Sequence, residues 1–298
     1  MRRMSQNSNC TKNPIMTQKN TAKYKEPTPQ VGFGGGHPPL LCRERKYEML
    51  GNVVKFELKK QFRKRLLTLA FMEFMLSAVG LGIYLTYSTP QRTSYEAFSF
   101  SIFTILPMAL PLFAALSTGI TLAEERSLGL LPLFLSRGVS PCKYILGKTI
   151  GSMMAQTCLT LGTLGAFLLA THMFFPAGPI LTFGATCGQS LALENPLAHC
   201  MASILVYVLA ALAFNGTALF VSVWVSNIFV VAATPTILYF AAFYISALMN
   251  SNLNPYLYLA LNQHGPSTFA SVAVYWIIAA VFSHGLAVLC FSLKKNWS

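Results

Sequence analysis

The chain has 298 residues, of which 54% are hydrophobic and only 10% are charged, with a mean hydropathy of +0.51. A soluble domain carries about 25% charged residues, so this composition excludes an ordinary soluble protein and indicates a membrane protein. The formal net charge of +13 would also fit a nucleic-acid-binding protein. However, 15 of the 22 Lys and Arg residues precede Leu66, so anionic lipid headgroups are the simpler partner and nucleic acid is excluded as the main one.

The amino-terminal segment, residues 1–45, is rich in Asn, Thr, Lys, Pro and Gly and shows no apolar period. Such a composition predicts a disordered cytoplasmic tail. The first long apolar run starts near Leu66, too deep for a cleavable signal peptide, so we expect the first span to target the chain. Met49 begins a segment typical of the start of a membrane protein, and mass spectrometry of the native amino terminus would show whether residues 1–48 belong to it.

Residues 46–65 have the pattern of an amphipathic helix. Their apolar side chains fall within an arc of about 120° at helical spacing; they are Tyr47, Leu50, Val54, Leu58 and Phe62. Most of the lysines and arginines lie off that arc, although Phe56 is on the polar side. A basic amphipathic helix leading into a span is expected to lie in the inner interface of the membrane.

Six apolar runs reach the length of roughly 20 residues that is needed to cross a bilayer. They make residues 66–298 an all-α integral membrane domain, with spans expected near 66–87, 97–122, 149–173, 199–224, 228–249 and 269–293. With both termini cytoplasmic, the inner segments hold 21 Lys and Arg residues and the outer connections hold one, Arg92. The positive-inside rule therefore predicts that orientation.

Prolines and glycines mark special positions in these spans. Pro107, Pro111 and Pro235 predict kinks. Four glycines of the third span predict close helix packing rather than a ligand site; they are Gly147, Gly151, Gly162 and Gly165.

The cytoplasmic connection 123–148 is charged at both ends and rich in leucine between them. A loop this apolar is expected to bury that surface against the rest of the protein, the membrane or a partner. Its ends, Glu124-Glu125-Arg126 and Arg137, are suited to the polar rim of a docking contact.

This connection also carries a resemblance. An acidic pair followed by Arg, a Gly, a Leu-rich run, Ser-Arg and Tyr-x-x-Gly-Lys resembles the type-2 ABC transporter permeases, as does the Asn-Gly-Thr-Ala-Leu-Phe-Val-Ser stretch at 215–222. The resemblance covers about 240 residues. It implies six spans, inward termini, an amphipathic connecting helix and a coupling helix that docks on a separate ATPase. Pro132, inside the leucine run, departs from the pattern and is expected to shorten or bend the helix.

The resemblance also implies which residues act and with what. The coupling element would comprise Glu124, Glu125, Arg126, Gly129, Leu130, Leu131, Ser136, Arg137, Lys143, Tyr144, Gly147 and Lys148. The chain would work as a homodimer or as a heterodimer with a second permease, together with ABC ATPase subunits, usually for export across a plasma membrane such as the bacterial inner membrane.

Gly147-Lys148-Thr149 is not a phosphate-binding loop, because Cys142 stands where that motif needs glycine and no soluble strand precedes it. We therefore expect no cofactor on this chain, and ATP and Mg²⁺ on the partner ATPase.

Few residues of the expected spans are ionisable or strongly polar. Glu73 is the only acid or base there, and it is either a functional carboxylate or a residue that reaches the inner interface. Asn215 and Thr217 either line a translocation path or bond across helices. The histidines lack the spacing of a metal site, so none is expected. Cys187 and Cys200 fall near the outer side, where ordinary thiols are commoner than a bridge.

Three other functions compete with the permease reading. A haem-exporter permease shares the six spans and a similar loop. An intramembrane enzyme would need a nucleophile beside a base, whereas Ser190 and Ser267 fall in outer connections. An ATPase-independent immunity or scaffold protein is the third. The spans lack a cluster of charge, which favours an amphipathic or apolar cargo over an ionic one.

Overall fold

The computed structural model describes residues 51, 53–61, 64–86, 92–136, 140–180, 189–249, 254–260 and 268–294. The predicted tail 1–45 lies outside this part of the chain. The described elements are helices, which confirms the predicted all-α fold. Residues 53–61 are helical. The later elements are α2 (Lys64–Thr86), α3 (Ser94–Ala114), the π-helical turn η1 (Ala115–Gly119), α4 (Thr121–Ser127), α5 (Leu130–Ser136), α6 (Pro141–Phe174), α7 (Gln189–Glu194), α8 (Pro196–Ser222), α9 (Ile228–Leu248), α10 (Leu257–Ala260) and α11 (Phe269–Leu293).

Six of these helices are long and apolar enough to span a membrane, namely α2, α3 with η1, α6, α8, α9 and α11. Their number and order confirm the predicted multi-pass membrane protein. The largest difference is at α6, which begins at Pro141 instead of residue 149. A proline fits the first turn of a helix, where its missing N–H has no partner to lose, so the helix runs through Tyr144 and Lys148.

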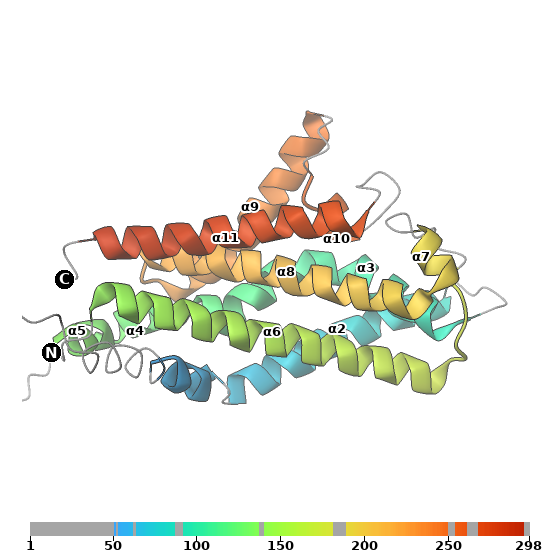
Figure 1. Ribbon diagram of the computed structural model, residues 1–298, viewed down its shortest axis with the longest axis horizontal. Coiled ribbons are helices and arrows are strands. Elements are labelled where there is room, and N and C mark those ends of the chain that lie inside the picture. The colour runs from blue at the N-terminus through green and yellow to red at the C-terminus, as the bar shows by residue number, and fades with distance from the viewer. Residues whose placement is uncertain are drawn as a thin grey trace, which may run out of the picture. The chain divides into compact units, whose positions relative to one another are not determined.

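Helix α8 is the centre of the packing. It contacts α3, α6, α9 and α11, and its pairing with α11 is the most extensive in the protein. Figure 1 shows α6, α8 and α11 running side by side, whereas α9 is inclined to them. Of the six spanning helices, α8 is the most buried and α9 the least. The main apolar core therefore surrounds α8.

One end of these helices is basic, and we call it the basic end. The start of α2 reaches η1 there, since Arg65 donates to the backbone oxygen of Leu116. The end of α11 reaches the end of α8, where Lys294 Nζ donates to the backbone oxygen of Val223 at 3.0 Å. The start of α6 lies at the same end, because Lys148 contacts Glu125 of α4.

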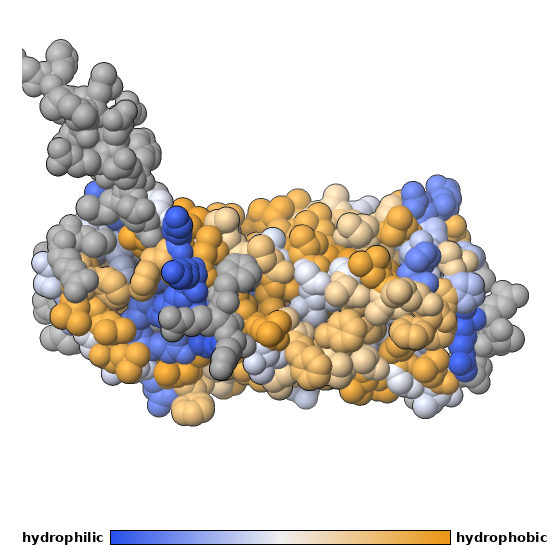
Figure 2. All heavy atoms as spheres, turned by 90° about the horizontal axis from the view of Figure 1, so that it is seen from below, coloured by the Kyte–Doolittle hydropathy of each residue, from blue (hydrophilic) through white to orange (hydrophobic). Residues whose placement is uncertain are grey.

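The opposite end joins the start of α3 to the end of α6. The backbone N–H of Ser94 donates to the oxygen of Pro176 at 2.9 Å, and Thr93 Oγ1 donates to the oxygen of Pro179 at 3.1 Å. Successive spanning helices thus alternate in direction. Figure 2 shows hydrophobic residues over the middle of the helices and hydrophilic ones toward both ends of the face it presents, which is the pattern of a membrane-spanning surface.

The prolines of α3 precede a change of helix type. Pro111 has no N–H to donate to the preceding turn, which weakens the ladder at that point. Four residues later α3 gives way to η1, where the N–H of Ile120 donates to the oxygen of Ala115, five residues back. Such π-turns change which side chains face the neighbouring helices. The kinks predicted at Pro107 and Pro111 stay a prediction, and the change of helix type follows directly after them.

The glycines of α6 differ in what they contact. At Gly151 an added Cβ would lie 2.9 Å from the Cβ of Glu57, so the prediction of close packing is confirmed there. At Gly162 and Gly165 an added Cβ would meet nothing within 4 Å, so the prediction is wrong for these two. Glycine spacing alone does not distinguish a packed face from an open one.

Candidate functional site

The connection between the second and third spanning helices folds into the two short helices α4 and α5. Gly129 turns the chain between them with φ +66°, a left-handed conformation that favours glycine. Pro132 lies in the first turn of α5, where its missing N–H breaks no intrahelical bond. Pro132 is expected to shorten or bend the helix, and α5 is seven residues long and begins only two residues before this proline.

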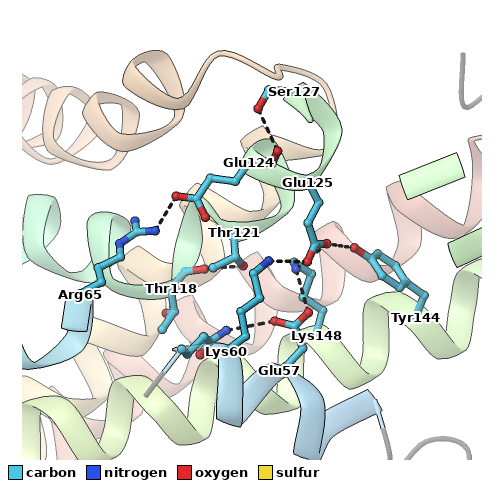
Figure 3. A network of polar contacts seen from close by, with 11 residues as sticks. Glu57, Lys60, Arg65, Thr118, Thr121, Glu124, Glu125, Ser127, Tyr144 and Lys148 are labelled. Carbon is cyan, nitrogen blue, oxygen red and sulfur yellow. Dashed lines mark hydrogen bonds and ion pairs between the residues drawn. The ribbon is translucent and has the colours of Figure 1, made fainter. Parts of the chain in front are cut away.

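The carboxylate of Glu125 is the centre of a buried network of polar side chains (Figure 3). Glu125 is 1% exposed, and it accepts from Lys60 Nζ at 2.7 Å, from Lys148 Nζ at 2.8 Å and from the hydroxyl of Tyr144. Lys148 is fully buried and also donates to Glu57 at 3.1 Å. We call these five residues the buried charge network. It joins the helix 53–61 to α4 and α6.

The network is balanced, with two carboxylates and two ammonium groups. Burial by itself would raise the pKa of Glu125, but the charges of Lys148 and Lys60 outweigh it and lower that pKa to about 2. Glu125 is therefore ionised at neutral pH. Buried charges are tolerated when each has a well-placed partner, so removing one member leaves another uncompensated.

Glu124 and Arg65 make a second connection from α4. Arg65 Nη1 donates to Glu124 Oε1 at 2.5 Å, and its other terminal nitrogen donates to the backbone oxygen of Leu116. Both side chains are partly exposed, so this pair adds less stability than the buried one. Its geometry nevertheless links the start of α2 to η1 and α4.

Arg126 connects α4 to the end of α8. Its Nη1 donates to the backbone oxygens of Ser222 at 2.7 Å and Val223 at 2.8 Å. The last carbonyls of a helix lack intrahelical partners and carry partial negative charge, so a guanidinium is well matched to them. Lys294, just after α11, donates to the same oxygen of Val223. Arg126 therefore holds α4 beside the ends of α8 and α11.

The exposed side of α4 and α5 carries leucines beside Ser127 and Ser136. Leu128 is 71% exposed and Leu133 is 55% exposed. On the inward side, Leu131 is buried in a cluster with Tyr144 and Phe291. Buried contacts thus hold the two helices on their inner side. Leu128 and Leu133 are exposed on the outer side, and we call the face that carries them the α4–α5 surface.

The residues predicted to form a coupling element divide into three groups. Those that face the interior are Leu131, Glu125, Tyr144, Gly147 and Lys148. Those at least partly exposed are Glu124, Arg126, Gly129, Leu130, Ser136 and Lys143. Arg137 lies outside the described residues. The acidic pair and Arg126 therefore act mainly as internal anchors, and the expected exposed polar rim is not formed by Glu125.

Sequence reasoning missed the part of the network that comes from the helix 53–61. Glu57 and Gln61 are buried there, while Phe56 is exposed and makes an edge-type ring contact with Phe134. Of the predicted apolar arc, Val54 and Leu58 are partly buried and Leu58 packs on the protein. Tyr47, Leu50 and Phe62 lie outside the described residues. The signal that could have revealed the contact is Glu57 itself, a lone acid within a strongly basic run.

The polar residues expected to line a path have different surroundings. Asn215 is buried and donates to Thr118 Oγ1, so it links α8 to η1. Thr217 donates only to Ala213 of its own helix, at 2.9 Å. Asn215 therefore serves helix packing in this structure, and Thr217 satisfies its hydroxyl locally.

The ionisable residues inside the spanning helices are more numerous than predicted. Glu73 is buried in α2, but Lys148 lies in α6 and Glu96 is buried in the first turn of α3, since both helices start earlier than expected. Cys200 is a free, buried thiol, and Cys187 is outside the described part. Among the residues described, no group of three or more His, Cys, Asp or Glu is suited to hold a metal.

Comparison with known proteins assigns no family, so the functional argument rests on the geometry of the site. No family model matches the chain, and a search of curated proteins found no match.

Proposed function

We propose that this chain is the membrane-spanning permease subunit of an ATP-binding cassette exporter, and that its α4–α5 surface docks on a separate ATPase. The observation that carries the proposal is the combination of exposed leucines outside with fixed ionic contacts inside. A loop held only by its own backbone would move with a partner without displacing the neighbouring helices. A loop that is bonded to four neighbouring segments transmits its own displacement to those segments.

The anchors support this reading because each leads to a different element. Glu125 leads to the helix 53–61 and to α6 through the buried charge network. Glu124 leads to α2, and Arg126 leads to α8. A movement of α4 would thus be felt by helices that form the transport pathway in a permease. The resemblance of residues 124–148 to type-2 ABC permeases points to the same role.

The orientation follows from charge. Lys and Arg concentrate at the basic end, whereas Arg92 lies at the other. The positive-inside rule puts the basic end in the cytoplasm, where ATP is present. The proposed location is therefore a plasma membrane, such as the bacterial inner membrane, with ATP and Mg²⁺ bound by the partner ATPase.

A second permease, identical or a sister chain, would complete the transporter, as the resemblance implies. Helix α9 is the least buried of the spans, with Phe229 and Leu248 largely exposed, and is therefore available to lipid or to such a subunit. The proposed cargo is amphipathic or apolar, because the described charges of the spanning helices lie toward their ends, apart from Glu73.

Isolation of the full chain from native membranes tests the proposal. We expect an ABC ATPase to accompany the unmodified chain and to be lost from a Leu128→Glu, Leu133→Glu variant, because two carboxylates cannot be buried unpaired in an apolar contact. Lys59→Glu is the matched control, since Lys59 is exposed at the same end but outside α4 and α5. If the unmodified chain purifies alone and fully active, the permease assignment fails, and an intramembrane enzyme or immunity protein becomes the better reading.

A further inference from the structure

Glu73 is a buried carboxyl group that the proposed docking site does not use. It lies eight residues after Arg65 on α2, about 12 Å along the helix at 1.5 Å per residue. The residue is 1% exposed, and among the described residues its Oε1 has no hydrogen-bond partner. Glu73 is therefore enclosed by protein, well inside the membrane-spanning part of α2.

Helix α2 packs against α3 and, less extensively, against α6. On the face that carries Glu73, Gly80 lies against Ser101 of α3, whereas the first turns lie against α6. Leu66 and Leu69, two turns and one turn before Glu73, form an apolar cluster with Ala155 and Leu159 of α6. Both helices start at the basic end, so Glu73 lies about one turn deeper than this cluster.

Helix α6 carries a buried polar stripe along the same length. Its members, spaced three or four residues apart, are Lys148, Ser152, Gln156, Thr160 and Thr163. Gln156 accepts from Ser117 of η1 and donates to Thr160 at 3.0 Å. Neutral hydroxyl and amide groups thus follow Lys148 along the buried side of α6.

No described cation is placed to neutralise an ionised Glu73. Arg65 is paired with Glu124, and Lys148 is paired with Glu57 and Glu125. On the elements that pack against α2, η1 has no titratable side chain. Those on α3 and α6 are Tyr95, Glu96, Cys142, Lys143, Tyr144, Lys148, Cys158 and His172. A buried carboxylate without a partner costs several kcal/mol, so the neutral acid is the stable form.

We propose that Glu73 is a proton-binding site inside the membrane, occupied while α2 packs against α3 and α6. If the helices separate during transport and water reaches the carboxyl, ionisation becomes favourable and the proton leaves. The packed state would then be favoured by protons and the separated state by their removal, as linkage requires. This last step rests on the proposed transport cycle, whereas occupancy of the site does not.

Infrared spectroscopy of the purified full chain, without any ATPase, tests the occupancy. The nine acidic residues are all glutamates, so few carboxyl bands compete. At neutral pH we expect the carbonyl band of a protonated acid, lost in Glu73→Gln and kept in Glu96→Gln, the other described acid inside a spanning helix. A spectrum without that band, or a band that survives Glu73→Gln, would overturn the proposal.

Carbodiimide labelling of the unmodified chain tests the same site without depending on a variant that folds. Dicyclohexylcarbodiimide is apolar and reacts with protonated carboxyls, so peptide mass spectrometry should find the adduct on Glu73 and not on the ionised Glu125. Labelling of Glu125 with none on Glu73 would refute the site. Neither measurement involves an ATPase, so a failure here leaves the docking proposal standing, and failure of docking leaves the proton site standing.

Discussion

At the residue scale, Lys148 is the group on which the buried charge network depends, since it lies between Glu57 and Glu125 at 3.1 and 2.8 Å. Lys148→Met removes one partner and leaves Glu57 with an uncompensated buried charge. We expect it to lower the free energy of unfolding by about 3 to 5 kcal/mol. Denaturation in mixed detergent micelles measures the change.

The control for Lys148→Met removes the charge on both sides of the pair. In Glu57→Leu, Lys148→Met the buried acid disappears together with its base, while Lys60 still pairs with Glu125. Replacing a buried pair with apolar residues is often neutral, so most of the lost stability should return. If Lys148→Met alone is as stable as the unmodified chain, the network is not buried.

The lowered pKa of Glu125 predicts how the free energy of unfolding depends on pH. Its folded-state pKa of about 2 lies below the ordinary 4.5, so the stabilisation is present above pH 4.5 and is lost as the pH falls through about 2. The difference amounts to about 3 kcal/mol. Unfolding measured across this range should show the loss in the unmodified chain and in Glu194→Gln, an exposed control, but not in Glu125→Gln. Equal acid dependence in all three chains would contradict the assigned pairing.

At the scale of elements, the contact of α8 with α11 depends on Gly216. An added Cβ there would lie 2.9 Å from His284 Cδ2 and against Ser283, so neither helix can keep its place. Gly216→Val should lower the melting temperature by several degrees, whereas Gly162→Val, which meets nothing within 4 Å, should change it little. Equal effects at the two glycines would show that α8 and α11 pack differently.

The spanning helices could be predicted from sequence because each is a long apolar run between polar ends. Helix α11 has the predicted bounds, since Thr268 caps its start and Lys294 follows its end. The start of α6 could not be predicted, because Tyr144 and Lys148 look like loop residues until their partners are known. The partners of Lys148, Glu125 and Glu57, lie 23 and 91 residues before it in the chain and meet α6 only in the folded protein.

The same reason explains what was missed at the candidate site. A leucine-rich loop with charged ends predicts a docking element, and Leu128 and Leu133 are indeed exposed. The sequence alone does not show that Glu125 is buried or that Arg126 reaches the end of α8, since helical spacing gives each residue's direction only relative to its own helix. Their partners on α6 and α8 decide it.

At the scale of the whole molecule, the account requires the basic end to be cytoplasmic. Two single-cysteine chains test this, one retaining Cys142 and one carrying Glu194→Cys; both positions are exposed, at opposite ends of the spans. A membrane-impermeant maleimide should label Glu194→Cys in intact cells and Cys142 only in inverted vesicles. The reverse pattern would place the α4–α5 surface outside, away from ATP.

The most direct test of the central claim is hydrogen–deuterium exchange of the native complex with and without ATP and Mg²⁺. The account predicts that ATP changes exchange in residues 121–136, and that the change extends to the start of α6 in the unmodified chain. It should not extend there in Glu57→Leu, Tyr144→Phe, Lys148→Met, where the polar contacts between Glu125 and α6 are removed. Exchange in residues 121–136 that is unaffected by ATP would contradict the claim that this loop couples an ATPase to the membrane helices.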